Sequence, residues 1–534
     1  MRSDAEQVTL DYVDAVHQRV RQPMQPPGFT PDWADRPLPH THHPGAERIA
    51  LPFPADLAPP FPADRAMRTG TGQGVLGLDE LAADLQAAIG IAARRCHVDW
   101  DTAVEEMTSP RSARWGRGSA SGGGTYPLEV YWSAGPSAPV PAGIYHYATG
   151  LHAMERLSSQ DPTATVHAAL GPGAADLGDQ FLLCTVRLWK NSFKYHNLAY
   201  HLATLDLGAF TGSWGLLCRD RDIAHHRRLW FDESALNGLL GLDPDQESVH
   251  AVLPLPWGTS RRWTAPTAPV PGAARPPHHE RSRTVRDFPL ARAVLRATAD
   301  APVTAPVAAP AHTSRMTDPS DSTRHVPLPR RAHPLLAGRA AETLARRTSA
   351  FGRFDGARPL EADLLGAVIH EALTTDPAPS ANGEPVGLTG IHVVARRVTG
   401  LEPALYAYHG GDRHTLTRAP GDGLSAVTQE LYGMDNYAVS HAAAMLVLDW
   451  HPEQAVSTYG PRAYRAANVE AGAVVQRAHL AATALGLASG IVLGLDAVAL
   501  DEALGLPGKG RRSQVYLFLG HPQAGAAALD GRLR

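Results

Sequence analysis

The chain has 534 residues, of which 44% are apolar, and its formal net charge is -4. This length exceeds what one ordinary hydrophobic core fills, so two domains are expected, and the apolar fraction excludes a disordered chain. Charges of both signs are mixed along the sequence, which leaves no electrostatic footprint for nucleic acid.

Membrane and metal motifs are also missing from the sequence. No stretch of about 18 uncharged apolar residues occurs, and the N-terminus lacks the apolar core of a signal peptide, so a cytoplasmic protein is expected. Cys96, Cys184 and Cys218 are odd in number and far apart, which disfavours a disulfide framework or a cysteine zinc site. Histidines cluster at 40–43, 225–226 and 278–279 without helical ligand spacing, so no metal site is predicted.

The first half of the chain, residues 1–264, is predicted to be one domain. Its elements in chain order are an amphipathic helix at 78–90, a glycine-rich loop at 120–127, strands near 127–132 and 141–152, a long helix from about 194 and a closing strand at 251–256. Apolar periodicity near 3.6 residues predicts the helices, and short β-branched and aromatic runs predict the strands. Together these indicate an α+β unit with a central mixed sheet.

Residues 265–333 separate the two halves. This stretch is rich in Pro, Ala, Thr and Ser, a composition that cannot bury a core. We therefore predict a semi-extended linker with a short helix near 288–299, followed by a second domain at 334–534.

The second half repeats the first. Residues 141–152 recur at 403–414, an offset of 262, and residues 194–210 recur at 458–474, an offset of 264. Residues 239–243 also recur at 503–507, again 264 positions later. Ordered matches at one spacing indicate a fused duplication, whose two units should pair about a pseudo-twofold axis as an intramolecular pseudo-dimer.

Two basic clusters flank the second half. RRTSAFGRF at 346–354 precedes its first helix, and GKGRRS at 508–513 precedes its last strand. Arginine offers a planar fork of donors that suits phosphate, and a serine hydroxyl can complete the cradle. The clusters could converge on one phosphate, although two solvated basic surfaces would give the same pattern.

Glycine-rich loops offer a second kind of binding feature. Ser121 precedes Gly122, Gly123 and Gly124, and the second half places Ser380 and Asn382 similarly. Bare backbone and short polar side chains can approach a flat ligand closely, and a plain surface turn would look alike.

Several of these segments resemble known flavoproteins. RRTSAFGRF, APSANGEP (378–385) and LGLASGIVLG (485–494) are similar to motifs of nitroreductase-fold enzymes. The segments at 118–132, 193–210 and 459–487 resemble more specifically those of SagB-type azoline dehydrogenases, here in a tandem-domain form. Those enzymes act beside cyclodehydratases on ribosomally made peptides. The resemblance covers about residues 65–260 and 340–522, and it implies FMN bound between the two units.

The resemblance assigns cofactor contacts by position. It implies that the FMN phosphate is held by Arg346, Arg347, Ser349, Arg353, Lys509 and Arg511. The ring would lie near residues 488–490, including Ser489 and Gly490, with Ser121 and Gly122 reaching across from the first half. The mirror site offers only Arg65 and Arg68, so one flavin site is predicted.

The resemblance also implies a catalytic pair, Lys194 and Tyr195, whose counterpart in the second half is Thr458–Tyr459. The first half departs from the family motif, because His196, Leu198 and His201 replace its glycine and two arginines. The second half keeps Gly460, Arg462, Tyr464 and Arg465, which leaves open whether the site uses one half's motif or both.

The implied reaction is oxidation of a thiazoline or oxazoline to an azole in a precursor peptide. FMN can accept the hydride, and Tyr195, held as a phenolate by the Lys194 charge, could remove the proton. Without the resemblance, Lys194 would be a solvated residue and Tyr195 a packed aromatic. Two alternatives stay open: an NAD(P)H-dependent nitro- or quinone reductase, and a flavin-free scaffold that binds a peptide or a cyclodehydratase.

Overall fold

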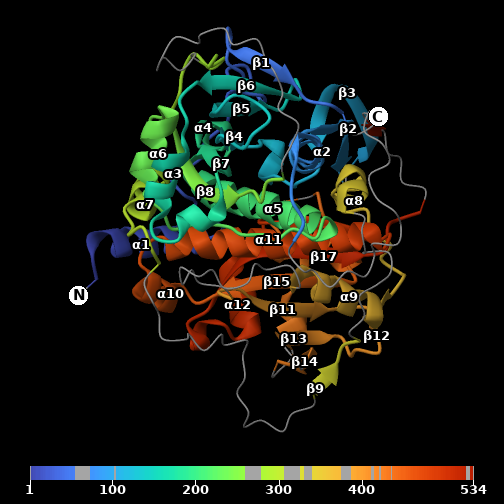
Figure 1. Cartoon of the computed structure of the whole chain (residues 1–534). Coiled ribbons are helices and arrows are strands. Elements are labelled where there is room, and N and C mark those ends of the chain that lie inside the picture. Colours follow the sequence, from blue (N-terminus) through green and yellow to red (C-terminus); the bar gives the residue numbers. More distant parts are fainter. Residues whose placement is uncertain are drawn as a thin grey trace.

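The computed structural model describes residues 2–53, 73–101, 104–258, 278–305, 325–329, 340–373, 387–410, 414–419, 423–434, 436–524 and 530–532. Two sheets lie above and below a pair of long central helices, α5 (Ala199–Asp220) and α11 (Ala463–Ala484) (Figure 1). The first half forms the upper layer and the second half the lower one.

The first-half sheet has six strands in the order β1-β6-β5-β4-β7-β8. Their bounds are β1 Glu47–Ala50, β4 Leu128–Ala134, β5 Gly143–Ala148, β6 Ala153–Ser158, β7 Gln180–Arg187 and β8 Glu247–Pro254. The helices of this half are α2 (Leu78–Ala88), α3 (Thr163–Leu170), α4 (Trp189–Tyr195), α5 and α6 (Glu233–Leu240).

The second-half sheet has the order β16-β17-β15-β11-β13-β14-β9. Its strands are β9 His325–Pro327, β11 Gly390–Ala395, β13 Ala404–His409, β14 Thr415–Arg418, β15 Ala444–Trp450, β16 Ala488–Val492 and β17 Arg512–Gly520. Its helices are α8 (Ala340–Arg346), α9 (Ala362–Leu373), α10 (Pro452–Tyr459), α11 and α12 (Ala497–Leu504). The expectation of mixed sheets was wrong, since every described strand pair in these two sheets is antiparallel. Apolar alternation along a strand does not encode the direction of its neighbour.

The central helices preserve the duplication in three dimensions. Tyr200 stacks on Tyr464 with ring centroids 6.2 Å apart, and Asn468 donates to the Thr204 hydroxyl at 3.1 Å. The helices approach each other closely at Gly208 and Gly472, where a Cβ atom on Gly472 would lie 3.0 Å from the Gly208 Cα. Each pair is separated by 264 positions, the sequence offset of the repeat, so the two helices run side by side in the same direction.

We expect Gly472→Ala to destabilise the protein by about 1–3 kcal/mol, because the new Cβ atom would sit 2.2 Å from the Leu205 carbonyl oxygen and force the helices apart. Chemical denaturation measures this free energy. Gly238→Ala is the matched control: Gly238 is exposed on α6 with nothing within 4 Å of its Cβ position, so it should be neutral or stabilising by up to about 1 kcal/mol. Equal effects of the two changes would contradict the close crossing.

The stretch predicted as a linker contributes ordered elements. α7 (Pro289–Ala299) is the short helix expected there, and it packs against the N-terminal helix α1 (Asp4–Gln18). β9 joins the edge of the second-half sheet beside β14. Ala291, Val294 and Leu295 of α7 are buried, so an amphipathic face covers this segment although its overall composition is linker-like.

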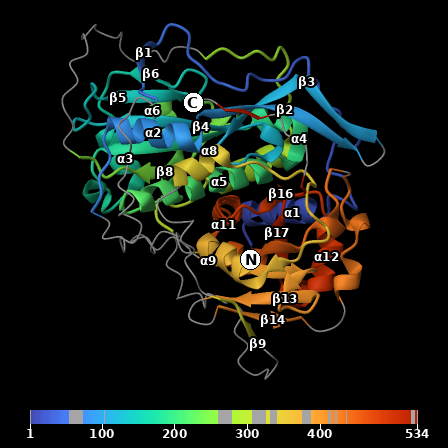
Figure 2. The same cartoon turned by 90° about the vertical axis from the view of Figure 1, so that its right-hand side faces the viewer.

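Further contacts cross between the halves. β18 (Asp530–Arg532), near the C-terminus, pairs with β2 (Ile91–Asp101) of the first half, and β2 pairs with β3 (Val104–Arg117). In the view of Figure 2, α1 lies beside α11 and β17 of the second half. A two-residue parallel pair, β10 (Leu360–Glu361) with β12 (Val398–Thr399), completes the strands.

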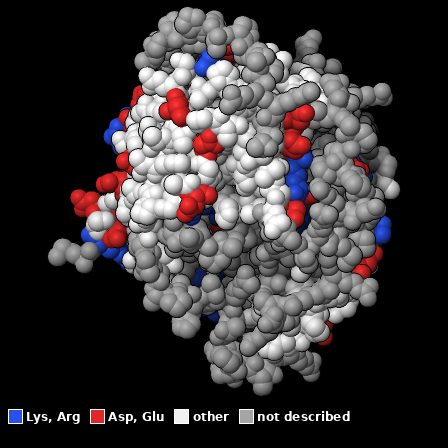
Figure 3. Space-filling view, in the orientation of Figure 1, with Lys and Arg blue, Asp and Glu red and all other residues white. Residues whose placement is uncertain are grey.

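Among the described residues, no helix is both long and apolar enough to cross a membrane. Figure 3 shows acidic and basic side chains scattered over the described part of one face.

Candidate functional site

A loop of the first half crosses to the buried arginine of the second-half motif. Arg347, 3% exposed, donates from Nε to the Gly118 carbonyl at 2.6 Å and from a terminal nitrogen to the Arg117 carbonyl at 3.1 Å. Two positions further on, the backbone amide of Ala120 donates to Gln476 of α11 at 3.2 Å. Residues 117–124 therefore run along the interface between the halves, and the first two of them contact Arg347.

The middle of this loop is held by a buried carboxyl group. Asp206 on α5 accepts from the Ser121 hydroxyl at 2.5 Å and from the Gly122 amide at 2.9 Å. Burial raises the pKa of Asp206 to about 7, although these hydrogen bonds act in the opposite direction. Ser121 also accepts from the Tyr126 amide at 2.9 Å, so its hydroxyl fixes the turn from within.

The raised pKa of Asp206 predicts a specific pH dependence. The folded state holds this proton more tightly than the unfolded state, so the stabilisation is fully present below about pH 4 and is lost as pH rises through 7. Asp206→Asn should therefore gain free energy of unfolding relative to wild type between pH 4 and pH 8, by on the order of 1–4 kcal/mol. Denaturation curves across this range test it, and a difference independent of pH would refute the assignment.

The loop ends against the predicted catalytic pair. Lys194 and Tyr195 are the last residues of α4, and both are half-buried. A Cβ atom on Gly123 would lie 2.1 Å from the Tyr195 hydroxyl and 2.5 Å from the Lys194 ammonium nitrogen, and Gly123 has a φ of +61°. Only glycine therefore lets the backbone come this close to both polar groups. The Lys194 nitrogen is 4.7 Å from the Tyr195 ring centroid and 5.8 Å from that of Trp33.

Tyr432 of the second half is buried, and its ring packs against Tyr437 and Phe518 with centroids 6.0 and 6.1 Å away. Burial raises the pKa of Tyr432, and the phenols of Tyr437 and Tyr195 raise it further. The Gly433 amide donates to the Gly494 carbonyl at 3.0 Å, which joins the Tyr432 segment to the residues that follow β16. Met434, 52% exposed, lies at the surface of the same segment.

The other members of the arginine motif lie nearer to solvent than Arg347. Arg346 is exposed and pairs with Glu342 at 3.3 Å, and Ser349 is half-buried. The Arg353 backbone bonds to Ala350 and Gln523. Arg346 and Ser349 therefore present donors at the surface beside the buried Arg347.

Ser489 and Gly490 are packed within the protein. Ser489 is 2% exposed, its hydroxyl lies 2.5 Å from His479 Nδ1, and its carbonyl accepts from Ala350 at 2.9 Å. A Cβ atom on Gly490 would lie 2.2 Å from the Tyr437 hydroxyl. Arg347 donates to the other nitrogen of His479 at 3.0 Å, so Ser489 supports Arg347 through this histidine. Contact of Ser489 and Gly490 with a ring stays a prediction.

The second basic cluster lies at the other end of β17. Lys509 is exposed, and Arg511 is paired with Asp449 of β15. Ser489, beside Arg347, pairs with Leu519, eight residues along the strand from Arg511, or roughly 25 Å. The two clusters therefore do not converge in this structure. Phosphate binding by Lys509 and Arg511 stays a prediction.

Arg462 and Arg465 anchor the interface. Both side chains are fully buried, and they pair with Glu233 of the first half at 3.2 and 2.7 Å. Arg462 also donates to the carbonyls of Thr298 and Ala299 in α7. Arg462 and Arg465 therefore hold the two halves and α7 together. Both are distant from Lys194 and Tyr195 in the sequence.

Sequence reasoning missed the supporting residues Asp206 and His479. Both lie in long helices that also carry several other polar residues, so no sequence signal set these two apart. Ser380, Asn382, Arg65 and Arg68 lie outside the described residues.

These residues fit a flavin in three respects. Arg346 and Ser349 offer accessible donors for a phosphate beside the buried Arg347. Gly123 and Gly124 present exposed backbone with positive φ beside a phenol and an ammonium group. The half-buried ring of Tyr195 then provides flat apolar surface at the far end of the loop.

Comparison with known proteins confirms the predicted fold. Residues 347–521 match the model of the Nitroreductase family. A crystal structure from Anabaena variabilis, provisionally described as a nitroreductase, matches 97% of this chain and 99% of its own, with a TM-score of 0.73 and 21% identity. The whole chain therefore has a nitroreductase fold with two units, as the repeat predicted.

Other matches are partial. The E. coli microcin synthetase McbBCD complex with truncated pro-MccB17 bound aligns with 33% of this chain and 68% of the other, at 19% identity and a TM-score of 0.29. A protein of Ralstonia eutropha, also provisionally described as a nitroreductase, aligns with 41% of this chain and 95% of its own, at 20% identity and a TM-score of 0.28. No curated protein matches the sequence significantly.

Proposed function

We propose that this protein is an FMN-dependent oxidoreductase that converts azolines to azoles in a ribosomally made peptide. The observation that carries the proposal is the path of residues 117–124, which connect Arg347 of the second half to Lys194 and Tyr195 of the first. A phosphate-binding candidate and a proton-transfer candidate thus share one loop across the interface.

In this proposal residues of the loop and of the second-half motif would hold the cofactor. Bound FMN would supply an acceptor for the hydride that leaves the azoline ring. Arg346 and Ser349 would bind its phosphate, while buried Arg347 fixes the Gly118 end of the loop. Gly122, Gly123 and Gly124 let the backbone approach the flat ring, and Ser121 keeps the turn in place through Asp206.

The proton of the azoline ring is removed by a side chain of this chain. Tyr195 accepts it as a phenolate, and the ammonium group of Lys194 stabilises the negative charge on that oxygen. Both groups approach the same glycine, so they act at one place.

The asymmetry of the halves supports a single site. In the counterpart of the catalytic pair, the Thr458 hydroxyl donates to the Gln454 carbonyl of its own helix at 2.7 Å. Tyr459 there is only 7% exposed and packs in the core. The second half therefore offers no equivalent proton acceptor at position 458 or 459.

The decisive experiment combines flavin absorption with mass spectrometry. The protein, purified and supplied with FMN, is incubated with a precursor peptide in which a cyclodehydratase has already formed azolines. We expect a yellow protein and a product lighter by two hydrogen atoms per ring. Flavin binding with rapid NAD(P)H oxidation and no change in the peptide would favour the reductase, and peptide binding without flavin would favour the scaffold.

A further inference from the structure

Histidines from three distant parts of the sequence gather at one place in the first half. The ring of His43 lies 5.0 Å from that of His146 on β5 and 6.4 Å from that of His278, and His42 lies 6.2 Å from His279. The histidine clusters at 40–43 and 278–279 therefore meet around a buried strand, which their spacing in the sequence did not reveal.

Three of the gathered side chains have the geometry of a ligand set. One ring nitrogen each from His43 and His146 and one carboxylate oxygen of Glu155 all lie within 4.8 Å of one another. All three residues are buried, with exposures of 0%. Two imidazoles and one carboxylate are a ligand set that suits zinc.

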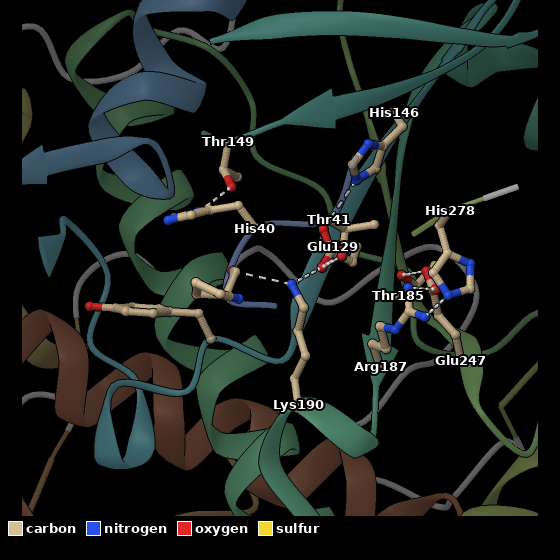
Figure 4. Close-up of polar contacts among 12 residues, drawn as sticks. His40, Thr41, Glu129, His146, Thr149, Thr185, Arg187, Lys190, Glu247 and His278 are labelled. Carbon is tan, nitrogen blue, oxygen red and sulfur yellow. Dashed lines mark hydrogen bonds and ion pairs between the residues drawn. The ribbon is translucent and has the colours of Figure 1, made fainter. Parts of the chain in front are cut away.

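The contacts of the two ring nitrogens of His146 are also those of a metal ligand. Its Nε2 atom lies 3.1 Å from Glu129 Oε2, while its Nδ1 atom lies 3.3 Å from Glu155 Oε2. Glu129 is held in turn by Lys190 and by the Thr41 hydroxyl at 2.7 Å (Figure 4). A carboxylate on the outer nitrogen fixes the tautomer and orientation of a ligating imidazole.

Glu155 is oriented in the same way. Its Oε2 atom accepts from the His43 backbone amide at 2.9 Å, and its Oε1 atom accepts from Arg48 at 3.1 Å. The backbone bond draws the His43 segment onto the strand that carries Glu155. The position of all three candidate ligands is therefore fixed by contacts outside the ligand set.

We propose that His43, His146 and Glu155 bind a divalent transition metal, of which zinc is the best fit. On binding, the metal takes the place of the proton on His146 Nδ1, which passes to solvent, and no electron is transferred. The Nε2 proton stays directed at Glu129. In the metal-free protein each ring nitrogen of His146 faces a carboxylate.

A metal at this site would hold the N-terminal segment against α4, the helix that ends in Lys194 and Tyr195. Residue 39, four positions before His43, offers its carbonyl to Lys190 at 3.3 Å and to Arg117 at 3.1 Å. Lys190 lies one helical turn before Lys194, and Arg117 begins the loop described above. The metal would therefore stabilise the wall behind the proposed active site without touching its reactants.

The test uses the full chain stripped with a chelator and titrated with Co²⁺, whose visible absorption reports nitrogen and oxygen ligands. We expect one tight equivalent per chain, displaced by Zn²⁺, and a higher thermal unfolding temperature with Zn²⁺ present. His43→Ala and Glu155→Gln should each weaken binding by at least about 100-fold, more than loss of an outer-shell partner.

His392→Ala is the matched control, because His392 is buried and pairs with Asp449 at 3.1 Å in the other half. It should keep the tight equivalent. His43 lies in a loop segment, so its variant should remain folded, which circular dichroism checks. Absence of a stoichiometric cobalt band in the wild-type protein, or its survival in the His43 variant, would overturn the proposal. Both readouts are independent of flavin and of azoline oxidation.

Discussion

Lys194→Ala should lower the rate of azoline oxidation by about 100- to 10,000-fold, the usual contribution of a positioned acid or base. The Lys194 nitrogen and the Tyr195 hydroxyl both approach Gly123, so removing the ammonium group leaves the phenolate without its nearest positive charge. Flavin absorption and the free energy of unfolding should change little, because Lys194 is half-buried at the end of a short helix. Single-turnover measurement of peptide mass separates this effect from product release.

The duplication supplies the control for Lys194. Thr458→Ala changes the corresponding position of the second half, where the hydroxyl donates to a carbonyl of its own helix turn. It should leave the rate within about twofold of wild type. Tyr195→Phe should match Lys194→Ala in its effect, since both act on one proton transfer. Full activity of either first-half variant would show that the base lies elsewhere.

Glu233→Ala should destabilise the protein by about 3–5 kcal/mol, because it leaves two buried guanidinium groups without their carboxylate. Glu233 is 4% exposed, and the side chains of Arg462 and Arg465 are fully buried. Since the carboxylate belongs to the first half and both arginines to the second, the loss falls on the contact between them. Chemical denaturation followed by circular dichroism measures the change.

An exposed ion pair provides the comparison. Glu402 and Arg418 lie 2.8 Å apart, with side-chain exposures of 74% and 50%. Glu402→Ala should change the free energy of unfolding by less than about 1 kcal/mol, because water and salt screen such a pair. If the Glu233 variant were as stable as the Glu402 variant, the buried arginines would be stabilised mainly by backbone carbonyls.

The sequence was most informative where one pattern was repeated. The offset of 264 predicted paired units, and the same offset links Gly208 with Gly472 at the helix crossing. Strand and helix order followed from local periodicity, which depends on neighbours a few residues away. Strand direction did not, because it depends on pairing between distant segments.

Long-range partners explain what sequence reasoning could not place. Arg511 pairs with Asp449, 62 positions away, and the Arg462 and Arg465 side chains pair with Glu233, more than 200 positions away. A basic residue in a motif gives the same signal whether it meets a ligand or a buried carboxylate. The histidine clusters are the opposite case, because their spacing in the sequence gave no sign of a metal site. Their members come together only after the N-terminal segment and residues 278–279 reach β5.

The crossing of α5 and α11 has a consequence for how such a chain can change. In a homodimer every substitution appears on both sides of the axis, so one copy cannot lose a group that the other needs. Here His201 accepts a hydrogen bond from Tyr464 at 2.8 Å, while the residue 264 positions after His201 is Arg465, committed to Glu233. Covalent fusion lets each unit specialise independently, and the partner with the complementary change always travels on the same polypeptide.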